Sequence, residues 1–281
     1  MTAHYIPSDI IDFHVHLFPD RMFDAIWEYF SKCYKWDVIY RMYYRECISY
    51  LRERGVQKIV FSNYAHREGV AEALNAWNLE ILEGIPELYC FAAYHPGDEN
   101  GLAMADRVLS HPRVLGFKLQ LLVQRFFPHD NRLFPMYEKV MERGKRILFH
   151  VGTGPVGNEF VGLAEFNKLL DRYPDIPANV AHMGAMEYRG FMDLLEDHPA
   201  LYLDTAFAFF REFQGRGGFN LGNEELEKHK DRILYGSDFP NLIMPRESEI
   251  ATLSDYGLSP EFYERVFYRN ARELIDSIVN R

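Results

Sequence analysis

The residues of this chain with the clearest potential for chemistry are two histidines near its start, His14 and His16. They end an apolar run that reads as a β-strand, and side chains alternate between the two faces of a strand. We therefore predict that Asp12 shares a face with both histidines. The opposite face would carry Ile11, Phe13, Val15 and Leu17. Two adjacent imidazoles can bind one metal ion, but histidine is also an ordinary strand residue, so the pair alone does not define a site.

Residues that can bind a metal or carry a proton also end later apolar runs. His150 follows Ile-Leu-Phe, His182 follows Asn-Val-Ala, and Asp238 lies in Leu-Tyr-Gly-Ser-Asp-Phe-Pro. Lys118 lies within a further run of this kind, Gly-Phe-Lys-Leu-Gln. A buried histidine with a structural hydrogen bond is the usual explanation for any one of these residues. It does not explain why suitable ligands recur at the ends of several apolar runs.

A fold that brings these residues together must collect the ends of many strands. Strand-like and helix-like segments alternate along the chain, which predicts parallel β-α units. The predicted strands are residues 9–16, 57–62, 88–94, 114–120, 146–151, 178–183, 201–207 and 232–237. Eight units close a (β/α)8 TIM barrel, whose catalytic residues lie at the carboxyl ends of the strands. We predict this α/β fold, as a single domain over residues 1–281. An open doubly wound sheet would need an early glycine-rich phosphate turn, which the sequence lacks.

Residues 20–47 form an aromatic-rich insertion after the first strand. Phe23, Ile26, Trp27 and Phe30 have the spacing of an amphipathic helix. A stripe of this kind usually packs into the core. The alternatives are a lid over the site and a surface that pairs two copies in a homodimer.

Composition narrows the classes of partner. The net charge of −10 argues against nucleic acid and against anionic membranes, but not against a small anionic substrate that meets a local cation. Three scattered cysteines are too few for a disulfide framework, so buried thiols in a reducing cytoplasm are expected. No apolar run approaches the roughly 18 residues of a membrane-spanning helix. We therefore expect a cytoplasmic protein that acts on a small molecule.

The combined motifs resemble the amidohydrolase superfamily of metal-dependent barrels. Its pattern is His-x-His after strand one, histidines after strands five and six, and an aspartate after strand eight. The matching segments are Asp-Phe-His-Val-His, Phe-His-Val-Gly, Ala-His-Met-Gly and Gly-Ser-Asp-Phe-Pro. Gly-Phe-Lys-Leu-Gln and the late Tyr-Arg-Asn-Ala-Arg look like the branch that includes aminocarboxymuconate-semialdehyde decarboxylase. The resemblance spans the whole chain.

The resemblance implies that His14, His16, His150 and Asp238 hold one divalent ion, with zinc expected from three nitrogens and a carboxylate. Asp238 would take a proton from a metal-activated water and pass it to a leaving group. His182 would act as an electrostatic partner or general acid, or bind a second metal. Lys118 would be unmodified beside one metal, which we favour, or carry a carboxylate that bridges two.

The substrate is less well defined. Candidate substrate-binding residues on the loops are Lys118, Gln120, His66, His95, Arg125, Arg189 and Arg211. Convergence of two or three of the arginines would indicate a carboxylate substrate.

The first hypothesis for the function is a zinc hydrolase of a small ester, lactone or amide. The alternative is a zinc-dependent decarboxylase or hydratase of a small aromatic or unsaturated acid. A metal-stabilised binding protein is a third possibility, in which Asp238 and His182 would have no structural purpose.

Overall fold

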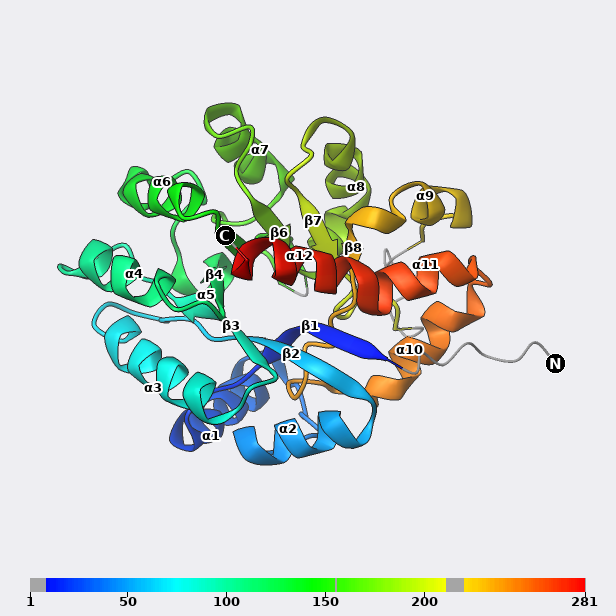
Figure 1. Cartoon of the computed structure of the whole chain (residues 1–281), viewed down its shortest axis with the longest axis horizontal. Helices are drawn as coiled ribbons and strands as arrows, with labels where there is room; N and C mark the ends of the chain where they lie inside the picture. The colour runs from blue at the N-terminus through cyan, green and yellow to red at the C-terminus, as the bar shows by residue number, and fades with distance from the viewer. Residues whose placement is uncertain (1–8, 155, 211–219, 281) are drawn as a thin grey trace.

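Eight parallel strands form one sheet whose spatial order is their order in the chain (Figure 1). The computed structural model describes residues 9–154, 156–210 and 220–280. The strands are β1 (Ile10–His16), β2 (Val56–Ser62), β3 (Leu88–Ala93), β4 (Val114–Gln120), β5 (Arg146–His150), β6 (Ala178–Val180), β7 (Tyr202–Asp204) and β8 (Ile233–Leu234). The segment after β8 returns to β1, where the Phe13 amide donates to the Tyr235 carbonyl at 2.9 Å. This contact closes the sheet, and the predicted barrel is confirmed.

Helices follow the strands and form the outer layer of the barrel (Figure 1). They are α1 (Asp20–Tyr29), α2 (Tyr44–Glu53), α3 (Ala71–Gly84), α4 (Gly101–Leu109), α5 (Leu121–Gln124), α6 (Phe134–Glu142), α7 (Leu163–Arg172), α8 (Tyr188–Asp197), α9 (Asn223–Lys228), α10 (Arg246–Asp255), α11 (Pro260–Glu264) and α12 (Asn270–Val279). Within the described ranges, none of these helices is long and apolar enough to cross a bilayer.

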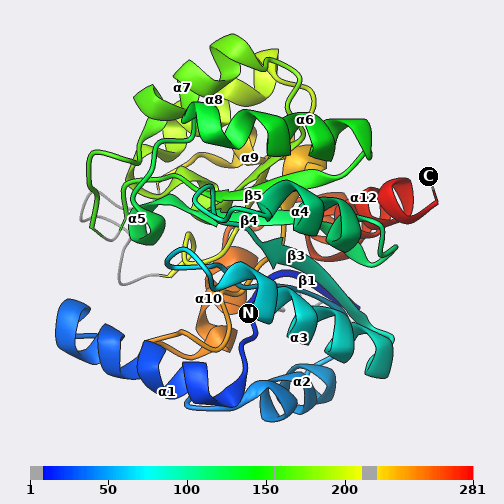
Figure 2. The ribbon, with the colours of Figure 1, turned by 90° about the vertical axis from the view of Figure 1, so that its left-hand side faces the viewer.

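The last helix, α12, covers one end of the barrel. In Figure 1 it crosses in front of the strands, and in Figure 2 it lies at the end opposite α1 and α5. Leu274, Ile275 and Ile278 of α12 pack in one cluster with the inward-facing side chains of the strands, among them Phe91 and Leu148. A larger apolar cluster fills the space between the strands and the outer helices. Because α12 covers the amino ends of the strands, their carboxyl ends are the open side where a site can form.

Strand β1 does not alternate strictly, so the predicted sharing of faces is wrong. Ile11 and Phe13 pack inside the barrel, whereas Val15 and Leu17 pack in the outer cluster. The pairing of β1 with β2 is irregular between Asp12 and Val15, as expected where a bulge places an extra residue in one strand. The bulge therefore separates Asp12 from the face that carries the histidines.

The later strands are shorter than predicted. β6 ends at Val180, and the run expected to continue it forms a turn from Ala181 to Glu187 instead. His182, Met183 and Ala185 have positive φ angles of 58°, 51° and 54° in this turn. Such a run is costly for residues other than glycine and is typical of functional sites. The turn directs His182 by a strained backbone rather than by strand alternation.

The insertion after β1 packs partly in the core and partly against a pocket. α1 buries Phe23 and Trp27, as an aromatic stripe in a core does. The π-helical turn Phe30–Tyr34 and the following Trp36 instead line the pocket described below. Of the cysteines, Cys47 and Cys90 are buried as expected, whereas Cys33 is exposed.

Candidate metal centre and active site

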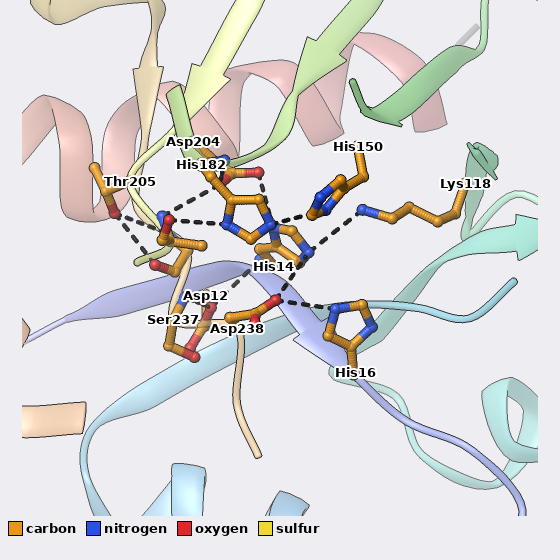
Figure 3. A network of polar contacts seen from close by, with 12 residues as sticks. Asp12, His14, His16, Lys118, His150, His182, Asp204, Thr205, Ser237 and Asp238 are labelled. Atoms are coloured by element: carbon orange, nitrogen blue, oxygen red, sulfur yellow. Dashed lines mark hydrogen bonds and ion pairs between the residues drawn. The ribbon is translucent and has the colours of Figure 1, made fainter. Parts of the chain in front are cut away.

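His14, His16 and Asp238 converge at the carboxyl end of the barrel (Figure 3). Each offers one ligand atom, and these atoms lie within 4.8 Å of one another. Oδ1 of Asp238 is 3.0 Å from Nε2 of His16 and 3.4 Å from Nε2 of His14. All three residues are buried. The predicted pairing of the first and last strands at one site is therefore present in the fold.

The ring of His14 is oriented by Asp204 at the end of β7. Oδ2 of Asp204 lies 2.9 Å from Nδ1 of His14, and a carboxylate can only accept in such a bond. The proton of His14 is therefore on Nδ1, and its lone pair on Nε2 faces Asp238. Burial, together with the charge of Lys118, lowers the pKa of His14 well below its ordinary value, so the ring is neutral. A neutral imidazole whose other nitrogen donates to a carboxylate is typical of a metal ligand.

His182 and His150 form a second oriented pair. Nδ1 of His182 lies 2.9 Å from the carbonyl oxygen of Ala206, so it donates there. Nε2 of His182 then accepts from Nδ1 of His150 at 3.1 Å. This leaves Nε2 of His150 with a lone pair, buried and without a hydrogen-bond partner among the described residues. Burial holds the pKa of His150 well below its ordinary value.

The carboxylate of Asp238 is held on a strained backbone. Its φ angle is +62°, and its amide donates to the carbonyl of His14 at 2.8 Å. Burial alone would raise the pKa of Asp238, but its contact with His16 lowers it to about 2. Asp238 is therefore ionised at neutral pH and can act as a ligand or as a base.

Lys118 faces the interior, as its place in β4 predicted. Its Nζ is fully buried and lies 3.5 Å from Nε2 of His14 (Figure 3). Burial lowers the pKa of Lys118 to about 8, although Asp204 and Asp238 act in the opposite direction. Lys118 is therefore mostly protonated at neutral pH, and an added cation beside His14 would favour its neutral form.

A pocket of about 1100 Å³, partly open to solvent, lies over these groups. Its polar lining comes from His16, His150, His182, Asp238, Gln120 and Asn241. Its walls are aromatic or apolar, and the rings come from Phe30, Tyr34, Trp36, Tyr64 and Phe207. Trp36 stacks on Phe207 with ring centroids 5.6 Å apart and planes at 13°. The insertion after β1 and the loop after β7 thus build one wall together.

Several predicted substrate-binding residues do not reach this pocket. The side chains of His66, Arg125 and Arg189 are exposed to solvent and do not line the pocket. Arg189 forms an ion pair with Glu225 at 3.6 Å. His95 is half-buried and packs against Phe126. Gln120 does line the pocket, and its buried Oε1 has no partner in the part of the chain that the structure describes. Arg211 lies outside the described residues.

Other contributors had weak signals in the sequence. Asp204 ends a short apolar strand, which is the same signal that identified the histidines, yet its role needed the contact with His14. Asn241 follows the aspartate motif directly and lines the pocket. Asp12 and Arg246 are fully buried and lie 3.7 Å apart, a pairing between chain ends that no local pattern indicates.

The donor set suits a divalent cation. His14 and His150 present lone pairs, Asp238 supplies negative charge, and His16 lies within the same group. Imidazole nitrogens and one carboxylate are the ligands that zinc prefers, and manganese also accepts them. The second group with metal-ligand chemistry, His14, His182 and Asp204, is already connected by hydrogen bonds. The oxygens of Asp204 are occupied by Nδ1 of His14 and the amides of His182 and Ala206.

Comparisons with known proteins agree with this geometry. A family model described as Amidohydrolase matches residues 11–276. No curated protein matches the chain in sequence. An uncharacterised TIM-barrel protein from Bordetella bronchiseptica has a TM-score of 0.73 at 16% identity, covering 97% of this chain and 100% of that one.

Two solved 5-carboxyvanillate decarboxylases also share the fold. The enzyme from Sphingomonas paucimobilis has a TM-score of 0.68 at 12% identity, covering 96% of this chain and 99% of its own. The enzyme from Novosphingobium aromaticivorans, solved with manganese and 4-hydroxy-3-methoxy-5-nitrobenzoic acid, has a TM-score of 0.64 at 13% identity. It covers 95% of this chain and 96% of its own. At these identities the likeness shows the fold.

Proposed function

Because the chain belongs to the amidohydrolase family, we propose that it is a divalent-metal-dependent lyase that removes the carboxyl group of a small aromatic or unsaturated acid. The observation that carries this proposal is the change of polarity along the pocket. Its floor holds the histidines and Asp238, and its walls are aromatic. A planar apolar molecule with one anionic end fits such a pocket, because the charged end meets the ligand group and the ring packs between the walls.

His14, His16, His150 and Asp238 would hold the cation, and zinc is the ion we propose. When bound, it supplies Lewis-acid chemistry, polarising an oxygen and lowering the pKa of water. Among the described residues that line the pocket, none is lysine or arginine, so the charge of a substrate carboxylate has no other strong partner there. The aromatic walls exclude water from the carboxylate, which favours a transition state with more diffuse charge.

Decarboxylation breaks the bond between the carboxylate and its carbon, leaves the electron pair on that carbon and requires a proton there. Asp238 lines the pocket but is ionised, so it must receive a proton before it can give one. Water that enters the open side of the pocket would supply that proton. His182 also lines the pocket and is held by Ala206 and His150, which makes it the second candidate donor. The shared fold with 5-carboxyvanillate decarboxylases supports this reaction class.

Hydrolysis of a small ester, lactone or amide is the second candidate. The observation that favours it is the low pKa of Asp238, about 2, because an ionised carboxylate beside a cation is ready to accept a proton from water. In both reactions the ionised Asp238 first accepts a proton. In a hydrolase it passes that proton to a leaving group, whereas in a lyase it passes it to the carbon that lost the carboxylate.

The test is a substrate panel run in deuterated water with zinc-loaded or manganese-loaded protein. Aromatic and unsaturated acids are compared with lactones, esters and amides, and both released carbon dioxide and the product are measured. A lyase releases carbon dioxide and incorporates one deuterium at the carbon that lost the carboxylate. Turnover of the lactones or esters alone, without carbon dioxide, would replace the proposal with the hydrolase.

Two variants assign the turnover to the candidate centre. Asp238→Asn removes the ionised carboxylate while keeping its shape, and should lower turnover by about 10³-fold or more, as expected when an acid-base group and a ligand are lost together. Asp175→Asn makes the same chemical change on the surface and should leave turnover unchanged. Activity that survives removal of the metal by a chelator would reject both candidate functions.

A further inference from the structure

A second set of charged side chains is buried behind the candidate metal centre, between β1 and α10. Arg246, the first residue of α10, is 1% exposed, and Asp12 is fully buried. Nε of Arg246 lies 3.7 Å from Oδ2 of Asp12, and its guanidinium lies 5.4 Å from the centre of the Tyr235 ring. The bulge in β1 makes this contact possible, because it separates Asp12 from the histidines.

The other carboxylate oxygen of Asp12 contacts both segments that carry predicted ligands. Oδ1 accepts from the amide of Ser237 at 3.0 Å and from the amide of His14 at 3.4 Å. Ser237 immediately precedes Asp238, and Figure 3 shows Asp12 and Ser237 beside that carboxylate. One side chain thus joins the backbone of a β1 ligand to the backbone that leads into the ligand after β8.

This ion pair is poorly explained by stability alone. Nε and Nη2 of Arg246 and Oδ2 of Asp12 have no hydrogen-bond partner within the described ranges. Burying two charges is expensive, and apolar replacements of buried ion pairs are often at least as stable. Arg246 lies on the Oδ2 side of Asp12, which leaves Oδ1 facing the backbone amides of Ser237 and His14.

The residue that benefits is Asp238. Its φ angle of +62° is rare outside glycine, and such a conformation persists only where the surroundings fix it. Three hydrogen bonds of backbone amides hold the segment to β1: the Asp238 amide donates to the His14 carbonyl, the His16 amide donates to the Phe239 carbonyl, and the Ser237 amide donates to Asp12. Loss of the bond to Asp12 would release the turn on the side that precedes the strained residue.

We propose that Arg246 is a positioning residue of the metal centre, which holds the Asp12 side chain in place so that Asp12 fixes the Ser237–Asp238 turn against His14. The inference rests on the proposed metal centre. It assigns a role to a residue on α10 that does not line the pocket. Metal affinity and ligand geometry should therefore depend on Arg246, although it does not touch the metal.

The experiment measures cobalt and zinc binding to the full chain, together with the visible spectrum of the cobalt-loaded protein. Arg246→Met keeps the apolar stem of the side chain and removes its charge. It should weaken metal binding by about 10- to 100-fold, as loss of groups behind the ligands does, and change the cobalt bands. Arg246→Lys, which restores the charge, should recover part of the affinity. Asp12→Asn is nearly isosteric and should reproduce the loss, so it decides the question if Arg246→Met does not fold.

Two controls separate positioning from general damage. Glu249→Gln alters another buried carboxyl group on α10, which accepts from the amide of Phe209 at 3.1 Å rather than contacting Asp12. Arg146→Met removes another buried arginine, which bonds Asn179 and the carbonyl of Ala178. Both should keep wild-type metal affinity in the folded protein.

Wild-type affinity and cobalt spectrum in both Arg246→Met and Asp12→Asn would overturn the inference, even if their thermal stability falls. Failure of the wild-type protein to bind any divalent metal would instead reject the proposed function on which the inference rests.

Discussion

Nδ1 of His14 lies 2.9 Å from Oδ2 of Asp204, a carboxylate 190 residues further along the chain. This contact determines which nitrogen of His14 carries the proton and which faces Asp238. The position of Lys118, 3.5 Å from the same Nε2, adds a titratable group to that edge of the site. The predictions below follow from these contacts and from the aromatic wall of the pocket.

Replacement of Asp204 by asparagine should weaken metal binding by about 10- to 100-fold. An asparagine amide can donate to Nδ1 of His14, which would move the proton to Nε2 and remove the lone pair that faces Asp238. Calorimetric titration with zinc checks the prediction, with Asp175→Asn as the matched surface control. Equal affinity in both variants would show that Asp204 does not orient His14.

Purified protein should bind one divalent ion per chain, with Lys118 unmodified. Nε2 of His182 already accepts from Nδ1 of His150, and Asp204 already accepts from His14 and from two backbone amides, so a second ion would have to break these bonds. Elemental analysis gives the stoichiometry, and intact mass measured with and without added bicarbonate tests Lys118. Two ions per chain together with a bicarbonate-dependent carboxylated lysine would contradict the prediction.

The stability of the metal-free protein should depend on pH through Lys118. Its folded pKa is lowered from 10.5 to about 8 by burial, so between these values the unfolded chain binds more protons than the native protein. Stability therefore rises as pH increases from about 8 to 10.5, by an amount of the order of 3 kcal/mol for this shift. Below pH 8 both states are protonated, and the contribution is constant.

Urea unfolding of the wild-type protein and of Lys118→Met across this range isolates that contribution. Lys118→Met should lack the rise, while the remaining groups change in parallel in both proteins. Parallel stability curves for the two proteins from pH 7 to 10.5 would mean that Lys118 has an ordinary pKa in the fold.

Replacement of Trp36 by alanine should weaken binding of aromatic acids and leave metal binding unchanged. The rings of Trp36 and Phe207 stack with their centroids 5.6 Å apart, and both rings line the pocket. Loss of one aromatic contact corresponds to about 2- to 10-fold in affinity. Inhibition or fluorescence titrations with benzoate analogues measure this loss. Tyr43→Ala changes a partly exposed ring of the same insertion that does not line the pocket, and should have no effect.

The sequence determined the repeating architecture and the types of the central residues. Eight apolar runs, each followed by a helical segment, predict the barrel, because the period of the side chains reflects which face is buried. His14, His16, His150 and Asp238 could be chosen because suitable ligands recur at the ends of several buried strands, which a structural hydrogen bond at any one of them does not explain. Their roles as metal ligands remain a prediction.

Only the tertiary structure decided where several side chains point and which distant residues meet, because neither the alternation of faces along a strand nor a sequence motif contains this information. The bulge in β1 changes which residues face the inside of the barrel after Asp12. A strict alternation of faces along the strand cannot predict this change. β6 ends early, so His182 is placed by positive φ angles rather than by its position in a strand. Arg125 and Arg189 do not converge on the pocket, because loop residues carry no periodic signal of where they point. The contact of Asp12 with Ser237 joins residues 225 positions apart, and only closure of the barrel brings them together.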